Sequence, residues 1–309
     1  MTVTLPTIAI TVGDPSGIGP EIAVKASRDP RVLAVCRPVL YGPTTPEELA
    51  PYPVGVVNAE SGHRAHDEVV RAVKDARLGE VAAIATAPIN KASFAAAGLP
   101  WRGHTDLLAH LCGVDEAIMM FWSEPLRVVL ATVHMPLAQV PAALTSERLR
   151  HTIHVTAQAL PRFGIPQPRI AVAGLNPHAG EDGLLGREEL DTLVPAIAAE
   201  RDAGIRVSGP YPADTLFVRA SRGEFDVVIA CYHDQGLVPV KLLAFGHAVN
   251  VTLGLPIIRT SVDHGTAFDI ARQGKADEGS MVEAILLAAR LATPTPTSLQ
   301  GAFQPRGVR

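Results

Sequence analysis

The sequence is poor in cysteine and in aromatic residues, and it has no long run of one charge. Its 309 residues include three cysteines without a CxxC pair, and 5% are aromatic. A disulfide framework or a thiolate zinc site is therefore not expected. Lysine and arginine number 27 against 31 acidic residues, a formal net charge of −4, and no dense basic stripe occurs. With so few aromatic residues, this argues against a nucleic-acid partner.

Features of export and of membrane spans are also missing. The first ten residues, MTVTLPTIAI, lack the positively charged start of a signal peptide. The most apolar stretch, residues 237–258, is interrupted by Lys241, His247, Asn250, two prolines and two glycines. A lipid-spanning helix tolerates such a set poorly. We therefore expect a cytoplasmic protein without a membrane partner.

The sequence does contain a regular alternation of short β-branched runs and longer segments rich in Ala, Leu, Glu and Arg. This alternation predicts βαβ units and a mostly parallel sheet, and continuous apolar runs such as VVLATV are typical of strands covered on both faces. The Pro- and Thr-rich segment after residue 290 is expected to be irregular. The predicted strands are 7–12, 81–86, 127–133, 169–174, 226–232 and 248–253, and the predicted helices are 20–28, 65–76, 147–160, 187–203 and 279–291.

A glycine-rich segment, GDPSGIGPE at 13–21, follows the first predicted strand. Pro20 and Glu21 suit the first turn of a helix. Glycines at such a place allow the backbone to approach a ligand closely, although the spacing matches neither a Walker A loop nor GxGxxG. The segment is either a structural turn or a ligand cradle.

Three of the eleven histidines share a setting: His134, His178 and His233 each follow a predicted strand closely. The carboxyl ends of parallel strands gather at one edge of a sheet, where ligands bind. Three imidazoles there could hold a divalent metal, with Asp234 beside His233 as a supporting carboxylate or proton carrier. The alternative is that each histidine is a hydrogen-bonded structural residue.

Two further segments could face a ligand. His104 and Thr105 precede the apolar run LLAHLCG, so the start of this helix could hold a phosphate. Alternatively, Thr105 or Asp106 only caps the helix. The loop DHGTAFDIA at 263–271 has small residues before a helical segment and could accept a nucleotide.

Lys241 and Arg259 are cations within otherwise apolar sequence. Because burying an unpaired charge is costly, each would need an anionic partner. That partner is either a protein carboxylate or a phosphate or carboxylate of a substrate.

Taken together, the segments of this chain resemble the 4-hydroxythreonine-4-phosphate dehydrogenase family, NAD-dependent enzymes of pyridoxal phosphate synthesis. The motifs occur in the family's order and cover nearly the whole chain. They are GDPSGIGPE at 13–21, TAPINK at 86–91, GHTD at 103–106, ATVHMPL at 131–137, GLNPHAGE at 174–181, ADTLF at 213–217, YHDQGLVPVK at 232–241 and NVTLGLPIIRTSVDHGTAFDIA at 250–271.

The resemblance implies a two-lobed α/β/α fold like that of isocitrate and isopropylmalate dehydrogenases. The first α/β lobe would comprise residues 1–125 plus 255–309, and the second, residues 126–254, would form the interface of a homodimer. The active site would lie in the cleft between the lobes and be shared between the subunits.

The resemblance also implies roles for single residues. The metal ligands, contributed across the dimer, would be His134, His178 and His233. The substrate-binding residues would be His104, Thr105, Lys241, Asn250 and Arg259. The residues near the dinucleotide would be His264, Gly265 and Thr266.

The implied reaction is the oxidation and decarboxylation of 4-phosphohydroxy-L-threonine to 3-amino-2-oxopropyl phosphate. NAD or NADP takes the hydride, and a divalent ion (zinc, magnesium, cobalt or manganese) acidifies the hydroxyl and stabilises the enolate formed on loss of CO2. Asp234, Asp214 and Lys241 are candidates for the acid/base, and the residues do not decide among them.

Three alternatives stay open at this point. D-threonate or D-erythronate 4-phosphate dehydrogenases share the motifs, and KLL at 241–243 and AFD at 267–269 are similar to that branch, whereas PADTLF at 212–217 is similar to the vitamin enzyme. An aromatic cis-dihydrodiol dehydrogenase is disfavoured, because GHT at 103–105 and RTS at 259–261 suit a phosphorylated substrate. A metal-dependent binding protein without catalysis would keep the histidines but need not reduce NAD.

Overall fold

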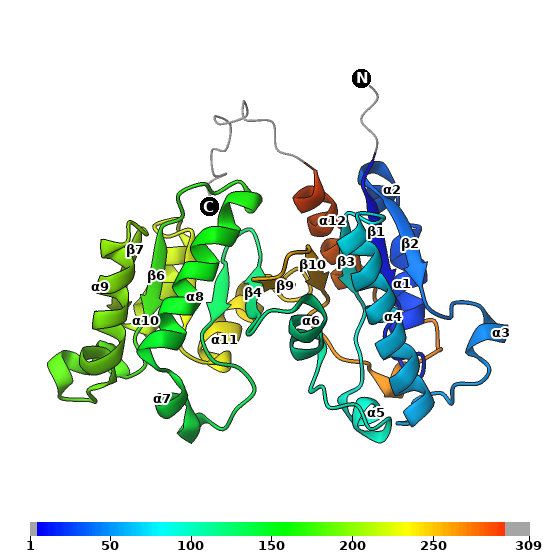
Figure 1. Cartoon of the computed structure of the whole chain (residues 1–309), viewed down its shortest axis with the longest axis horizontal. Coiled ribbons are helices and arrows are strands. Elements are labelled where there is room, and N and C mark those ends of the chain that lie inside the picture. The colour runs from blue at the N-terminus through cyan, green and yellow to red at the C-terminus, as the bar shows by residue number, and fades with distance from the viewer. Residues whose placement is uncertain (1–4, 294–309) are drawn as a thin grey trace.

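The structure is a computed structural model that describes residues 5–293. Its centre is one ten-stranded sheet with the order β2-β1-β3-β10-β9-β4-β5-β8-β6-β7 (Figure 1). The strands are β1 Thr7–Thr11, β2 Arg37–Tyr41, β3 Ala83–Thr86, β4 Ile118–Trp122, β5 Val128–Leu130, β6 Ile170–Ala173, β7 Val207–Tyr211, β8 Val227–Ala230, β9 Val249–Leu253 and β10 Arg259–Ser261.

The sheet has two parallel outer parts and an antiparallel centre. Strands β2, β1, β3 and β10 are parallel, as are β5, β8, β6 and β7, whereas β10–β9, β9–β4 and β4–β5 pair antiparallel. The expectation of a mostly parallel sheet is therefore met outside its centre. One row of the central strands is polar, because Ser261 pairs with both Thr86 and Asn250.

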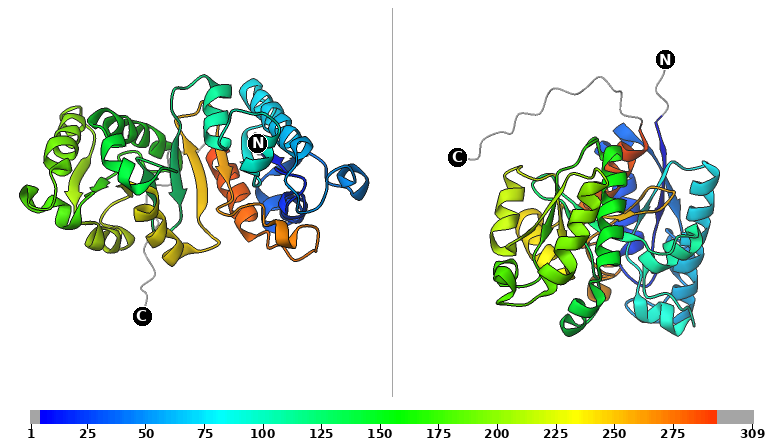
Figure 2. Two further views of the ribbon diagram at one scale, coloured as in Figure 1. Left: turned by 90° about the horizontal axis from the view of Figure 1, so that it is seen from below. Right: turned by 60° about the vertical axis from the view of Figure 1, so that its left-hand side comes forward.

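Helices cover both faces of the sheet and make three layers. They are α1 Gly19–Ser27, α2 Pro30–Val35, α3 Pro46–Leu49, α4 Ala59–Leu78, α5 Lys91–Ala96, α6 His104–Cys112, α7 Val140–Ala143, α8 Ser146–Ala159, α9 Val194–Asp202, α10 Ala213–Ser221, α11 His233–Ala244 and α12 Gly279–Ala292. Both views in Figure 2 place the N-terminal blue and cyan part beside the green and yellow part.

Alternating side chains of each strand enter different cores, as expected for strands buried on both faces. In β1, Ile8 and Ile10 pack with α1, α2 and α12, whereas Ala9 faces α4 and α6. In β4, Met120 packs with α8 and α9, whereas Met119 faces α10 and α11. The covering of both strand faces, predicted from the apolar runs, is confirmed by this packing, as is the α/β/α class that the resemblance implies.

The glycine-rich segment at 13–21 is a structural turn in this fold. Residues 11–20 are all buried. Ile18 N–H donates to the Thr266 carbonyl at 3.0 Å, and a Cβ on Gly17 would lie 2.7 Å from that same oxygen. On the other side, Asp14 N–H donates to the Pro88 carbonyl at 3.0 Å. The glycines therefore allow the turn to pack against two other loops, which cover its backbone.

The six predicted strands and five predicted helices all form, with some shifted ends. The helix predicted over 187–203 begins with a π-helical turn, Glu189–Leu193, before α9. Strands β2, β4, β7 and β10 were not predicted; β10 has three residues and β7 contains Gly and Pro, so neither has a strong strand pattern. Within residues 5–293, no helix is both long and apolar enough to cross a membrane. The irregular segment predicted after residue 290 lies mostly outside the described residues, and α12 continues to Ala292.

Candidate active site

Two of the three candidate metal ligands lie side by side. His134 follows β5 and His233 begins α11, and their ring centroids are 5.6 Å apart with an interplanar angle of 40°. Strands β5 and β8 are neighbours and parallel, which brings the residues after their carboxyl ends together. His233 Nδ1 lies 2.7 Å from Asp234 Oδ1, so this carboxylate can orient the ring.

The surroundings of His134 favour a neutral imidazole. His134 is exposed in the single chain, yet partial desolvation by its neighbours lowers its pKa, and the positive charge of Lys91 lowers that pKa further, while Asp106 acts in the opposite direction. The neutral ring is the form that binds a metal. A Zn–N bond is about 2.0–2.1 Å long, so two rings at this separation can bind one ion.

His178 does not join this pair within one chain. Among residues 5–293, no three His, Cys, Asp or Glu side chains lie close enough to hold a metal together. His178 is exposed and lies in the turn Pro177–Gly183, at a left-handed φ of 53°. His134 and His233 thus lie together, whereas His178 lies apart from them in the described chain.

Arg259 is a buried cation without an acidic partner. The side chain is 2% exposed, and it donates only to Thr252 Oγ1 at 2.8 Å and Thr86 Oγ1 at 2.7 Å. No carboxylate in the described chain forms an ion pair with it, and its Nε atom has no partner. Burial lowers the pKa of Arg259 to about 9. The protein-carboxylate alternative is therefore wrong for this residue within residues 5–293.

His104 lies within the electrostatic reach of Arg259. Burial, followed by the charge of Arg259, holds the pKa of His104 well below its usual value. Its Nε2 atom is buried without a partner, as is Oδ1 of Asn250. Thr105 is the second residue of α6, whose N-cap, Gly103, supplies no side-chain cap. Of the two residues proposed as caps, Thr105 makes no cap bond, whereas Asp106 reaches back from the first turn and accepts a bond from Arg102 N–H.

We expect His104 to make the protein less stable in mild acid. The pKa of His104 is lower in the folded than in the unfolded chain, so protons bind preferentially to the unfolded state as the pH falls below about 6.5. Relative to His104→Asn, the wild type should lose up to about 1.4 kcal/mol of unfolding free energy between pH 8 and pH 5.5. Urea unfolding at both pH values measures this. Equal losses in the two proteins would contradict it.

The other predicted residues are placed differently. Lys241 is exposed on α11 and Asp214 is exposed in the first turn of α10, so neither needs a partner within the chain. His264 and Gly265 are also exposed, and a Cβ on Gly265 would meet no atom within 4 Å. The neighbouring Thr266 is anchored from both sides, by Ile18 N–H on its carbonyl and by Asn90 Nδ2 at 3.4 Å from its hydroxyl. The loop of residues 264–266 is therefore exposed at His264 and Gly265 and hydrogen-bonded to the rest of the protein through Thr266.

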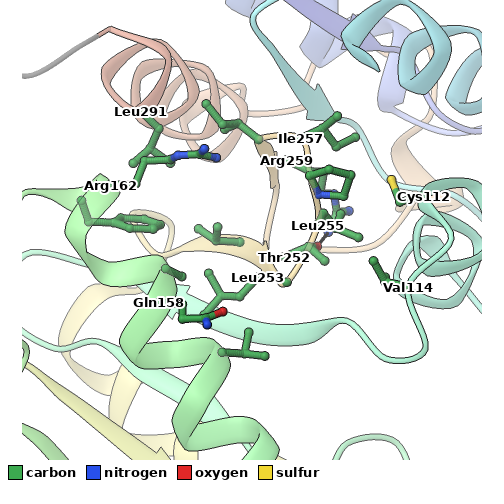
Figure 3. Close-up of a pocket in the computed structure, with 17 residues that line it drawn as sticks. Cys112, Val114, Gln158, Arg162, Thr252, Leu253, Leu255, Ile257, Arg259 and Leu291 are labelled. Atoms are coloured by element: carbon green, nitrogen blue, oxygen red, sulfur yellow. Dashed lines mark hydrogen bonds between the residues drawn. The ribbon is translucent and has the colours of Figure 1, made fainter. Parts of the chain in front are cut away.

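A cavity of about 510 Å³ lies beside the hairpin that joins β9 to β10, and residues 251–259 of this hairpin line it (Figure 3). Its walls are mostly apolar, including Phe163, Ile257 and Leu291, and none of the three histidines lines it. Arg259 and Thr252 lie on the same side of this cavity. It therefore adjoins the arginine but does not contain the predicted metal ligands.

Several residues near the site were not singled out from the sequence. Thr86 and Lys91 are the ends of the TAPINK motif, so the motif itself carried a signal for them. Thr252 and Ser261 had no such signal, since a hydroxyl in a strand is ordinary. Ser261 Oγ donates to the Thr86 carbonyl at 3.1 Å and so ties β10 to β3 beside Arg259.

Comparison with known proteins identifies the family of this chain. The family described as "Pyridoxal phosphate biosynthetic protein PdxA" matches residues 22–288. The chain is 44% identical over 333 residues to a 4-hydroxythreonine-4-phosphate dehydrogenase of Desulforapulum autotrophicum, covering 96% of this chain and 98% of that protein. It is also 44% identical over 326 residues to a D-threonate 4-phosphate dehydrogenase of Cupriavidus necator, covering 94% and 98%.

Solved structures place the fold as well. The crystal structure of 4-hydroxythreonine-4-phosphate dehydrogenase from Klebsiella pneumoniae matches with a TM-score of 0.83 and 41% identity, covering 93% of this chain and all of that chain. Isocitrate dehydrogenase from Methylococcus capsulatus, at 17% identity and a TM-score of 0.50 over 93% and 88% of the chains, shares the fold alone. The isocitrate dehydrogenase-like fold is thereby confirmed, and the chain belongs to the PdxA family.

Proposed function

We propose that this chain is a dehydrogenase that uses NAD or NADP and a divalent metal to oxidise a phosphorylated 3-hydroxy acid, followed by decarboxylation. The observation that carries this proposal is Arg259, a buried guanidinium with two hydroxyl partners and no carboxylate. An interior charge without a counter-ion is expensive. A phosphate is the anion that suits a planar guanidinium best.

The phosphate would bind between Arg259 and the start of α6. His104 Nε2 and the N–H groups of the first helical turn are further donors there, with Thr105 beside them. Asn250 and Lys241 would bind the other polar groups of the substrate. Since Lys241 is exposed on its own chain, we place it in the site of the neighbouring subunit.

His134 and His233 would hold the metal, with His178 as the third ligand. Imidazole nitrogen donors suit zinc, cobalt or manganese, and magnesium is the fourth candidate. When bound, the ion lowers the pKa of the substrate hydroxyl and stabilises the charge that develops on decarboxylation. Asp234 orients His233 through the 2.7 Å contact. Asp234, Asp214 and Lys241 are the three candidates for the residue that carries the proton.

The dinucleotide would lie on the loop of His264, Gly265 and Thr266. Its open outer surface and its anchoring through Thr266 support this placement. NAD or NADP supplies the oxidising group that accepts the hydride. The lobe boundaries of the sequence analysis, 1–125 plus 255–309 and 126–254, belong to the same proposal.

We propose a homodimer whose two sites are shared between subunits. Each histidine-bearing segment also carries large apolar side chains that are exposed in the single chain: Leu137 after His134, Leu184 after His178, and Val238, Leu242 and Phe245 after His233. Leu242 is 84% exposed and Phe245 76%. Apolar exposure of this extent is typical of a surface that another protein covers. A partner placed there would bring its own histidine turn near the His134–His233 pair.

For the substrate we propose 4-phosphohydroxy-L-threonine, which would yield 3-amino-2-oxopropyl phosphate in pyridoxal 5'-phosphate synthesis. D-threonate 4-phosphate is the second candidate, because the relative from Cupriavidus necator is as similar as the relative from Desulforapulum autotrophicum. D-erythronate 4-phosphate is chemically close to it. Both classes carry the phosphate that Arg259 would bind.

A parallel assay of NADH formation tests this proposal. The substrates are 4-phosphohydroxy-L-threonine, D-threonate 4-phosphate, D-erythronate 4-phosphate and an aromatic cis-dihydrodiol, each with added divalent metal and with a chelator as the control. We expect turnover of a phosphorylated substrate that the chelator abolishes, with the first substrate preferred. Turnover of the dihydrodiol alone would contradict the phosphate site, and no turnover of any substrate would favour a metal-dependent binding protein.

A further inference from the structure

The turn that carries His178 has an unusual backbone. Five consecutive residues, 178–182, have left-handed φ values of 53°, 53°, 82°, 44° and 54°. Only Gly180 among them is a glycine, and every other residue type is disfavoured in this region. A segment of this kind persists only where its surroundings impose it.

Glu189 forms two hydrogen bonds to the residue that precedes this turn. Both of its carboxylate oxygens bind Asn176, the residue two positions before His178. Oε1 accepts from Asn176 N–H at 2.7 Å, and Oε2 accepts from Asn176 Nδ2 at 2.9 Å. The glutamate is 2% exposed and forms no ion pair within residues 5–293. A buried carboxylate held only by one asparagine is costly, so a packed apolar residue would stabilise the lobe better.

The turn also wraps around this carboxylate. A Cβ on Gly180 would lie 2.7 Å from Glu189 Oε2, and a Cβ on Gly174 would lie 2.8 Å from the Ala179 Cα. Glycine at 174 and 180 therefore lets the backbone close over the carboxylate. The position of the turn, and with it that of His178, therefore depends on the position of the Glu189 carboxylate.

A second contact connects the base of the turn to the other histidines. Gln235, on α11, donates from Nε2 to the Gly174 carbonyl at 2.7 Å. Its Oε1 accepts from Cys231 N–H at 2.6 Å, two residues before His233. The Gln235 side chain therefore connects the residues that follow β6 to those that follow β8. This connection fixes the position of the turn relative to α11, which begins at His233.

We propose that Glu189 is a positioning residue for metal binding, which acts by holding the left-handed turn that presents His178. This inference rests on the proposed function, because His178 is a metal ligand only there. Glu189 is 2% exposed and both of its oxygens bind Asn176, so we assign it no ligand role of its own. It acts through Asn176 and the turn, and Gln235 keeps that turn in register with His233.

The test compares Glu189→Gln with Glu200→Gln in the full-length protein. Glutamine keeps the shape but replaces one acceptor oxygen by an NH2 group, which cannot accept from Asn176. Glu200 is a matched control: it is also buried in the second half of the chain, and it binds Arg150 Nε at 2.8 Å away from the turn. The measurements are Co2+ and Zn2+ affinity by calorimetry, the Co2+ absorption spectrum, and Tm without metal.

We expect Glu189→Gln to weaken Co2+ affinity about tenfold to hundredfold, the range found for residues that orient metal ligands, and to alter the Co2+ spectrum. Glu200→Gln should change only Tm. Wild-type affinity in Glu189→Gln would overturn the inference and leave this carboxylate a structural role.

If Glu189→Gln does not fold, Gly180→Ala serves as the second variant, since its Cβ would push against the intact carboxylate. It should weaken Co2+ binding in the same range, and unchanged binding would overturn the inference. Absence of metal binding in the wild type would instead overturn the proposed function itself.

Discussion

Replacing Arg259 by methionine is expected to lower kcat/KM for the phosphorylated substrate by about 10²–10³-fold without lowering Tm. Loss of buried, charge-assisted bonds to a phosphate costs about 2–5 kcal/mol, and each 1.36 kcal/mol is a factor of ten in rate. The fold should not suffer, because the wild type holds this charge on only two threonine hydroxyls. A methionine of similar length fills the space without a buried charge.

The control for this variant is Arg127→Met. Arg127 is also a partly buried arginine without an acidic partner in the described chain, but it stacks on Trp122 at 4.4 Å from the ring centroid. We expect Arg127→Met to lower Tm and leave kcat/KM unchanged. In addition, inorganic phosphate should raise the Tm of the wild type but not that of Arg259→Met. A fully active Arg259→Met would mean that the phosphate binds elsewhere.

The second large effect concerns the division of the metal site between subunits. His178→Ala and His134→Ala should each abolish turnover as homodimers while the protein stays folded, because both side chains are exposed in the chain. A heterodimer of the two variants should regain about half of the wild-type activity, since a shared two-fold site leaves one of its two sites intact. Two different affinity tags allow the heterodimer to be isolated after co-expression, and NADH formation measures its activity.

A heterodimer of His134→Ala and His233→Ala is the matched control. These two rings lie 5.6 Å apart in one chain, so in this heterodimer each site lacks one of them and no activity should return. Regained activity in this control would mean that His134 and His233 of the same subunit do not serve the same metal site. No activity in either heterodimer would place all three ligands in the same subunit.

The placement of His134 beside His233 could be predicted because both residues follow strands. An apolar run that ends in His134 or His233 predicts both a buried strand and a polar group at its carboxyl end. The meeting of these two rings then follows from the pairing of β5 with β8. His178 follows a strand too, yet its turn is left-handed and does not join them. No rule of periodicity predicts such a backbone for non-glycine residues.

Arg259 illustrates where sequence reasoning stopped. Its apolar neighbours predicted burial and therefore an anionic partner, but a protein carboxylate and a substrate phosphate remained equal alternatives. The pairing of β3, β10 and β9 brings Thr86 and Thr252 to the guanidinium and no carboxylate, which removes the first alternative within residues 5–293 and leaves the second as our proposal.

The glycine-rich segment at 13–21 shows the same difference between what local sequence patterns predict and what only long-range packing determines. Local patterns established the strand, the turn and the helix start, as well as the α/β class and the family, because propensity and motif spacing act over a few residues. Whether the turn would face a ligand or the interior depended on residues far away in the sequence, Pro88 and Thr266. Long-range packing determines which surfaces are covered, and for that reason the surroundings of this turn, of Arg259 and of Glu189 are visible only in the folded chain.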